Sequence, residues 1–273
     1  SVTVYAINVS LPNNSTKKFV MNIPMNMFLT KLKVNITDGK ETVFTKDFRI
    51  DPGSNMETYS IGILSDDFDS VRYMNKITMP NAGNFSTKTV KLDEENFPQS
   101  AEELRSFNIV VINNYDTSKL NNEQYEAMKN WVLGGGTLIL GTGPYYNKTL
   151  AVFKDDFING EIGEVQMLQT SSLYEIAGGN TSEETSVMNI SVLDMSIEDS
   201  LTVAEENGRP LVQKLEKGKG SVGIAAFDFG LEPLSAWVGN SAFADNLMVK
   251  LISSVYFRDM NQKGMPYDNL YLI

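Results

Sequence analysis

Cysteine and histidine are both missing from the 273 residues of this chain. Without cysteine there is no disulfide, no thiolate ligand for a metal and no thiol nucleophile. Without histidine there is no imidazole to act as the general base of a Ser-His-Asp or Cys-His arrangement. Together the two absences exclude every hydrolase or transferase whose chemistry depends on either residue.

Long apolar runs and an excess of basic residues are missing as well. No stretch of the chain approaches the roughly 18 apolar residues that a membrane-spanning helix needs. Lysine and arginine number 23 against 34 acidic residues, which gives a formal net charge of -11. Such a surface repels phosphate backbones and anionic lipids. We therefore expect no nucleic-acid partner, no cofactor, and membrane attachment only through segments outside this chain.

Residues 1–55 alternate apolar and polar side chains in the way that is typical of β-strands. Between the last two of the expected strands, Asp38 and Gly39 signal a tight hairpin turn, because glycine supplies the positive φ that such a turn requires. Four antiparallel strands in so short a segment predict a small, all-β, immunoglobulin-like partial sandwich. The expected strands cover residues 2–9, 18–23, 29–36 and 43–50.

Residues 56–262 alternate strand patterns with helix patterns, and residues 263–273 are expected to form an extended C-terminal tail. Strands are expected at 59–64, 88–92, 109–112, 137–140, 187–192, 212–215 and 222–227, and the runs at 59–64 and 109–112 are apolar in the way that is typical of buried parallel strands. Helices are expected at 69–77, 98–107, 121–134 and 242–256. This alternation predicts a three-layer α/β domain with a mostly parallel, flavodoxin-like sheet.

Two runs of residues in the α/β part carry a family resemblance. They are NIVVINNYDTSKLNNEQYEAMKNWVLGGGTLILGTGP at 108–144 and GKGSVGIAAFDFGLEPLSAWVGNSAFADNLM at 218–248. Both resemble the class I glutamine amidotransferase-like superfamily, and more narrowly such domains in large uncharacterised membrane proteins of Gram-positive bacteria. The resemblance covers residues 58–260 and implies the same three-layer fold. It also implies a position outside the cytoplasm, between a β-sandwich and transmembrane helices.

The chain departs from that superfamily at the position where its chemistry would take place. Amidotransferases place a nucleophilic cysteine on the tight turn after a central strand and use a histidine as base. The corresponding turn here is 140–144, which puts Thr142 at the nucleophile position with no imidazole to activate it. We interpret Gly141 and Gly143 as residues that shape the turn, and the domain as a catalytically degenerate pseudoenzyme.

Polar residues follow several of the expected parallel strands. The carboxyl ends of such strands meet at one edge of a sheet, where ligands of open α/β folds bind. Oxygen ligands there would suit Mg²⁺ or Ca²⁺, and Asp67 and Asp228 are the metal candidates. Asp and Asn also cap helices and close turns routinely, and that alternative stays open. The candidate ligand-binding residues are Asp66, Asp67, Asn113, Asn114, Asp116, Thr142, Tyr145, Asp228 and Trp237.

The expected function is that of a non-catalytic, extracytoplasmic binding or interaction module. It would belong to a larger protein of the bacterial cell surface, anchored in the membrane through regions outside this chain. Its partners would be neighbouring domains of the same polypeptide or another cell-envelope protein, with a glycan or peptide as candidate ligand. Two alternatives remain: a carboxylate- or divalent-cation-dependent enzyme acting on glycans at the strand ends, and a rigid spacer domain.

Overall fold

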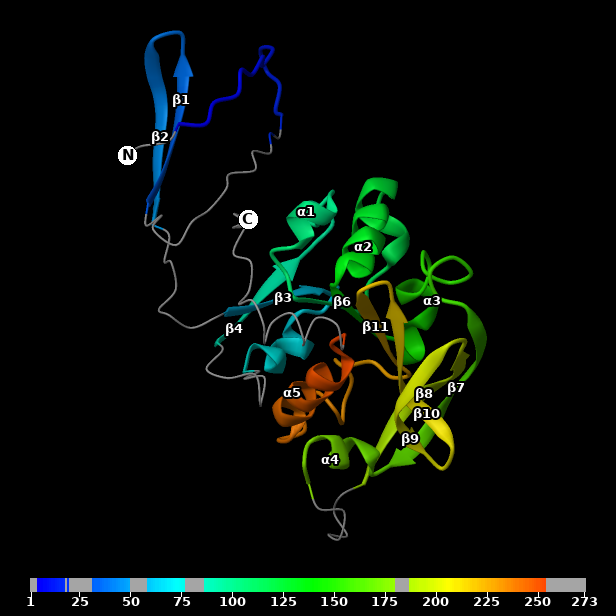
Figure 1. Cartoon of the computed structure of the whole chain (residues 1–273). Coiled ribbons are helices and arrows are strands. Elements are labelled where there is room, and N and C mark those ends of the chain that lie inside the picture. Colours follow the sequence, from blue (N-terminus) through cyan, green and yellow to red (C-terminus); the bar gives the residue numbers. More distant parts are fainter. Residues whose placement is uncertain are drawn as a thin grey trace. The chain divides into compact units, whose positions relative to one another are not determined.

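The computed structural model describes residues 4–17, 19, 31–49, 58–76, 86–179 and 187–253 (Figure 1). The described residues up to Arg49 belong to one compact unit, and those from Thr58 onwards belong to another. Each unit is described by itself.

The N-terminal unit contains an antiparallel hairpin of β1 (Lys31–Asp38) and β2 (Glu41–Arg49). Gly39 has a φ of 58° in the turn, so the predicted hairpin is confirmed. The strand predicted at 2–9 is wrong over its described part, since residues 4–9 form no strand. Alternation alone does not make a strand, because a strand also needs a hydrogen-bonded neighbour. The strand predicted at 18–23 lies almost wholly outside the described residues. Within the described part, this unit contains a small antiparallel sheet of two strands.

The second unit is built on a seven-stranded sheet with the order β4-β3-β5-β6-β11-β10-β9. The first five strands in that order are parallel, and β10 and β9 are antiparallel additions at one end. The predicted α/β domain with a mostly parallel sheet is confirmed. The strands are β3 (Thr58–Leu64), β4 (Ser86–Leu92), β5 (Ile109–Asn113), β6 (Thr137–Gly141), β9 (Ser200–Glu206), β10 (Arg209–Lys217) and β11 (Gly220–Ala225).

The five parallel strands have the order of a flavodoxin-like sheet, in which the direction of winding reverses between the first and third strands. Here those strands are β3 and β5, so their carboxyl ends mark the place where proteins of this fold class usually bind ligands. Every residue of β5 and β6 is buried, as expected for strands covered on both faces. Figure 1 shows α1 and α2 on one side of the sheet and α5 on the other.

The helix α2 (Asn122–Gly134) has an identifiable cap at each end. In α2, Asn121 accepts a hydrogen bond from the Gln124 backbone while the Gln124 side chain accepts one from Asn121, and Gly135 ends the helix at a φ of 131°. The segment predicted as a helix at 69–77 is a 3₁₀ helix, η1 (Asp69–Lys76). The other helices are α1 (Ala101–Leu104), η2 (Thr117–Lys119), η3 (Gly143–Tyr145), α3 (Tyr146–Thr149), α4 (Ser172–Ile176) and α5 (Asn240–Leu251).

The last helix, α5, is shorter than the sequence predicts. It ends at Leu251, whereas the pattern continues to residue 256. The buried ammonium of Lys214 donates to the Ile252 carbonyl at 2.8 Å, and the Ser253 hydroxyl donates to the Lys219 carbonyl at 2.5 Å. These contacts with the β10–β11 hairpin hold the chain out of the helical path immediately after Leu251.

A second antiparallel pair consists of β7 (Gly160–Thr170) and β8 (Met188–Ile197). It is connected to the seven-stranded sheet by isolated hydrogen bonds rather than by a continuous ladder. The Leu193 amide donates to the Ala226 carbonyl at 2.7 Å, just after β11. The sequence pattern predicts only the first half of β8 and misses β7 and β9. β7 is mostly exposed and β9 is partly exposed, and neither shows the clear apolar alternation that marks a half-buried strand.

We predict that Asn121→Ala lowers the free energy of unfolding by about 1 kcal/mol, because the first turn of α2 loses its side-chain cap. Urea unfolding of the whole chain measures the change. Asn122→Ala is the matched control, because Asn122 is exposed and lies one residue further into the same helix. Equal effects of the two substitutions would contradict the importance of the cap.

Candidate functional site

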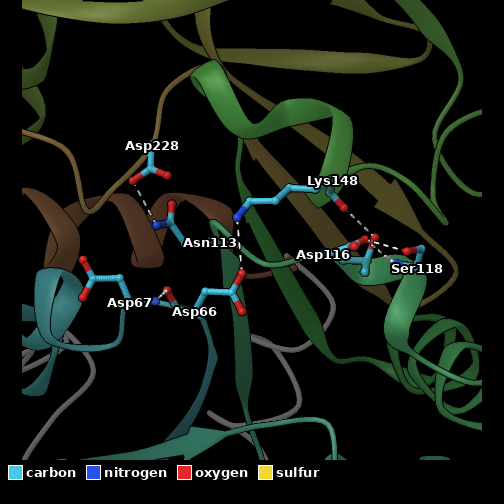
Figure 2. A network of polar contacts seen from close by, with 9 residues as sticks. Asp66, Asp67, Asn113, Asp116, Ser118, Lys148 and Asp228 are labelled. Atoms are coloured by element: carbon cyan, nitrogen blue, oxygen red, sulfur yellow. Dashed lines mark hydrogen bonds and ion pairs between the residues drawn. The ribbon is translucent and has the colours of Figure 1, made fainter.

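Polar side chains from three strand ends and one helix gather at the carboxyl edge of the parallel sheet, as Figure 2 shows. Asp66 and Asp67 follow β3, Asn113 ends β5 and Asp228 follows β11. Lys148 reaches them from α3 and is absent from the sequence-based candidates. We call these five residues the strand-end cluster. They lie where the fold predicts a ligand crevice.

The deepest contact in the cluster is made by the amide of Asn113, which is fully buried. Its Nδ2 donates to Asp228 Oδ1 at 3.0 Å, and its Oδ1 accepts from the Phe229 backbone at 2.9 Å. Asp228 Oδ1 also accepts from the Gly230 backbone at 2.6 Å. The end of β5 is thereby tied to the turn after β11, although β6 lies between the two strands.

Asp228 is a buried carboxyl group, with 4% of its surface exposed. Burial raises its pKa, although hydrogen bonds from Asn113, Gly230 and Leu231 and the nearby charge of Lys148 oppose the rise. Its Oδ2 is buried and has no hydrogen-bond partner among the described residues. Asp228 therefore holds a proton more readily than an ordinary aspartate does.

The outer part of the cluster is charged and open to solvent. Lys148 Nζ lies 3.3 Å from Asp66 Oδ2 and 4.9 Å from the centre of the Tyr145 ring. Asp66 and Asp67 are both exposed, and Tyr145 is half-buried. An ion pair this open is worth about 1 kcal/mol or less. These groups are thus free to exchange partners with a ligand at small cost.

Two of the predicted site residues also act as caps. Asp67 Oδ1 accepts from the Ser70 backbone at 3.3 Å at the start of η1. Asp116 Oδ1 accepts from the hydroxyl and the backbone of Ser118, at 2.6 Å and 3.1 Å, and caps η2. Hydrogen bonds from Ser118 lower the pKa of Asp116. The capping alternative that the sequence left open is correct for both residues.

Thr142 lies below the surface rather than at it. It is fully buried, and its hydroxyl donates to the Ala225 carbonyl at 2.7 Å. The next residue, Gly143, has a φ of 58°, and a Cβ there would approach the Asp228 backbone nitrogen to 3.0 Å. The turn that would carry a nucleophile in an amidotransferase is here part of the packed interior. The interpretation of Gly143 as a residue that shapes this turn agrees with that geometry.

The two remaining candidates have different surroundings. Asn114 has a φ of 49°, and its backbone carbonyl accepts from the Asp66 amide at 3.2 Å, while its buried Oδ1 has no partner in the described part of the chain. Trp237 is half-buried and packs on Tyr174 of α4 and Phe243 of α5, with ring centres 4.5 Å and 6.4 Å apart. Trp237 therefore belongs to the packing of the helices.

A cation site of several carboxylates is not formed by the described residues. Among them, no group of three or more acidic side chains is close enough to hold a metal ion. Asp67 and Asp228, the metal candidates of the sequence, come from different strand ends, and each uses an oxygen to accept backbone hydrogen bonds. The polar groups at this edge are therefore better suited to hydrogen bonding than to cation binding.

Comparisons with known proteins find one family model that matches the N-terminal segment, and solved structures that resemble a larger part of the chain. Residues 1–51 match a domain of unknown function (DUF8726), and no curated protein matches the chain. No helix in the described part is long and apolar enough to cross a membrane.

Three solved structures illustrate the similarity. The cytoplasmic protein STM1381 from Salmonella typhimurium LT2 is 18% identical, with a TM-score of 0.42, and the match covers 82% of this chain and 96% of that chain. The cytoplasmic protein STM3548 from Salmonella typhimurium is 14% identical, with a TM-score of 0.46, and the match covers 82% of this chain and 97% of that chain. The exo-β-1,4-mannosidase Op5Man5 from Opitutaceae bacterium strain TAV5 is 12% identical, with a TM-score of 0.47. That match covers 71% of this chain and 36% of the mannosidase, and such identities concern the fold alone.

We predict that Asp228→Asn removes a loss of stability that the wild-type chain shows as pH rises. Because the pKa of Asp228 is raised in the folded state above the ordinary value of 3.8, the folded chain binds the proton more tightly than the unfolded chain does. Asp228 therefore stabilises the folded chain at pH values below 3.8, and this stabilisation is lost as pH rises through the pKa of the folded state. The loss is about 1.4 kcal/mol for each unit by which the folded and unfolded pKa values differ. Urea unfolding from pH 4 upwards measures the difference between the two proteins. Parallel pH curves would contradict the prediction.

Proposed function

We propose that this chain is a non-catalytic binding module whose binding surface is the carboxyl edge of the parallel strands. The observation that carries the proposal is the division of this edge into two layers. Asn113, Asp228 and Thr142 form a buried floor, and most of its hydrogen-bonding groups are bonded within the protein. Asp66 and Lys148 stand above it with charged groups that solvent reaches.

The floor explains why we infer binding without catalysis. A nucleophile needs a base within hydrogen-bond reach and an exposed path to its substrate. The Thr142 hydroxyl has neither, because it is buried and donates to a backbone carbonyl. In a chain without histidine, the amidotransferase-like resemblance therefore fits a catalytically degenerate member of that superfamily.

The outer layer favours an uncharged, polyhydroxylated ligand such as a glycan. The carboxylates of Asp66 and Asp67 accept hydrogen bonds from hydroxyl groups, and the ammonium of Lys148 donates them. The half-buried ring of Tyr145, over which the Lys148 ammonium lies, adds apolar surface beside these polar groups. An anionic ligand would meet two carboxylates against one ammonium, and the net charge of -11 adds to this repulsion.

The cell-surface position is also part of the proposal. It rests on the resemblance of residues 108–144 and 218–248 to domains of Gram-positive membrane proteins. In that setting the module would contact neighbouring domains of the same polypeptide or another cell-envelope protein, and it would be anchored through segments outside this chain.

Thermal unfolding with oligosaccharides tests the binding proposal. Tetrasaccharides of glucose, mannose and N-acetylglucosamine at millimolar concentration are the probes. A ligand at one hundred times its dissociation constant adds about 2.7 kcal/mol of stability, which raises the unfolding midpoint visibly. We expect the rise in wild type and its loss in Asp66→Asn and Lys148→Ala.

Glu102→Gln is the matched control for these variants. It breaks a comparable exposed ion pair, that of Glu102 with Arg105, away from the strand-end cluster. This variant should keep the ligand-induced rise. The absence of any rise in wild type would instead favour the third reading, a rigid spacer. A rise that persists in both cluster variants would place the binding elsewhere.

One observation favours a second candidate, a carboxylate-dependent enzyme that acts on glycans. The raised pKa of buried Asp228, beside exposed carboxylates, resembles the separation of acid and base roles in glycosidases. Against it, Asp228 Oδ2 is buried, so a substrate could not reach the proton without rearrangement. Release of reducing ends from the same tetrasaccharides by wild type, with none released by Asp228→Asn, would favour the enzyme.

A further inference from the structure

A groove of about 360 Å³ lies at the end of the sheet formed by β9, and its lining is separate from the strand-end cluster. One wall is β9 itself, with Thr202, Val203 and Glu205. The other wall is the side of α4, with Ser172 and Glu175, and Lys250 of α5 also lines the groove. This volume lies within the range that is typical of ligand-binding pockets, and it has room for a short peptide segment.

The backbone of β9 gives this groove its chemistry. β9 is the last strand of the seven-stranded sheet and pairs with β10 alone, so its other edge has no strand beside it in the described part of the chain. Such an edge presents backbone donors and acceptors to an extended chain, except at Glu205, whose carbonyl already accepts from the Ser172 hydroxyl. Peptides bind to exposed sheet edges by adding a strand to the sheet, and here α4 lies beside the exposed edge.

A carboxylate at one end of the groove connects β9 to the start of α4 through hydrogen bonds. Glu206 Oε2 accepts from the Thr170 hydroxyl at 2.8 Å, the Ser171 backbone at 2.9 Å and the Ser172 backbone at 3.2 Å. Burial alone would raise the pKa of Glu206, but the hydrogen bonds from these residues lower it. The Ser172 hydroxyl also donates to the Glu205 carbonyl at 2.5 Å. The spacing between α4 and β9 is therefore fixed before any peptide binds, which reduces the entropic cost of binding.

An irregularity in β9 selects a short peptide over a second copy of the chain. Ala204 pairs with Val212 and Thr202 pairs with Gln213, so Val203 has no partner on β10, and Leu211 has no partner on β9; the pairing keeps the same register on both sides of this irregularity. An irregular edge of this kind opposes long, flat pairing between identical strands. A short peptide that pairs beside Leu201 and Thr202 does not need a long, regular strand edge.

The charges along the groove indicate the side chains of the peptide. Glu175 and Glu205 are exposed and form no ion pair among the described residues, and Lys250 is the single cation among the lining residues. The net charge of the whole chain, -11, adds to the negative potential. We propose that the β9 groove binds a short, extended peptide with basic side chains from another protein, as an added strand on β9.

Fluorescence polarisation with a labelled peptide, Thr-Lys-Thr-Lys-Thr-Lys, tests the proposal on the full chain. Threonine favours the extended conformation, and lysine supplies the positive charge. We expect binding to wild type and a loss of about tenfold or more in affinity for the double variant Glu175→Lys, Glu205→Lys. The double variant Glu164→Lys, Glu198→Lys makes the same charge change at exposed residues outside the groove and should bind as wild type does.

Backbone methylation separates strand addition from simple charge attraction. Two peptides are methylated on the backbone nitrogens of all threonines or of all lysines, so each blocks donors on one edge of the extended peptide. One should bind as the parent does and the other should not, because only one edge faces β9.

Four results would overturn the proposal. The first is no binding of the parent peptide, and the second is equal affinity for the two double variants. The third is the same affinity for both methylated peptides. The fourth is a concentration-dependent dimer of the wild-type chain, seen by sedimentation and lost in the double variant Glu175→Lys, Glu205→Lys. Such a dimer would show that the β9 edge binds a second copy of the chain. The oligosaccharide assay is independent, because it depends on Asp66 and Lys148 at the other site.

Discussion

The amide of Asn113 joins two strand ends that are not neighbours in the sheet. β5 and β11 are separated by β6, and the side chain of Asn113 crosses the end of β6 to reach Asp228 and Phe229. Gly141 makes the crossing feasible, because a Cβ there would lie 2.1 Å from Asn113 Oδ1. An unsatisfied buried polar group costs about 1–3 kcal/mol. The carboxyl edge of the sheet is therefore fixed by one amide and the space that one glycine leaves for it.

The rest of the strand-end cluster depends on that fixed floor. Asp228 keeps its buried position because Asn113 and the Gly230 backbone occupy one of its oxygens. The exposed charges of Asp66 and Lys148 are consequently presented from a rigid surface, and little entropy is left for a ligand to remove. A surface of this kind is suited to recognition, whereas proton transfer would require the buried carboxyl group to become exposed.

The sequence predicts the parts of this structure that local pattern determines. The buried strands β5 and β6 are continuous apolar runs, and α2 begins at an Asn121–Gln124 capping box, so both are predictable. Asp66, Asn113 and Asp228 could be placed at one edge because parallel strands share a direction. Lys148 could not, since its partner Asp66 lies 82 residues away and only tertiary packing brings them together. The ring contacts of Trp237 were unpredictable for the same reason, whereas β9 was missed because it shows no clear apolar alternation.

The antiparallel strands β10 and β9 change what the end of the sheet can do. β11 is buried along its whole length, so a sheet that stopped there would expose an apolar strand. β10 covers β11, and β9 then forms an outer edge that is half-exposed and irregular at Val203. The addition protects the core and leaves a short open edge beside α4. The two proposed binding surfaces are thus distinct: charged side chains at the carboxyl ends of the parallel strands, and backbone groups at β9. Because both are rimmed with carboxylates, both disfavour anionic partners, and they differ in whether side chains or backbone select the ligand.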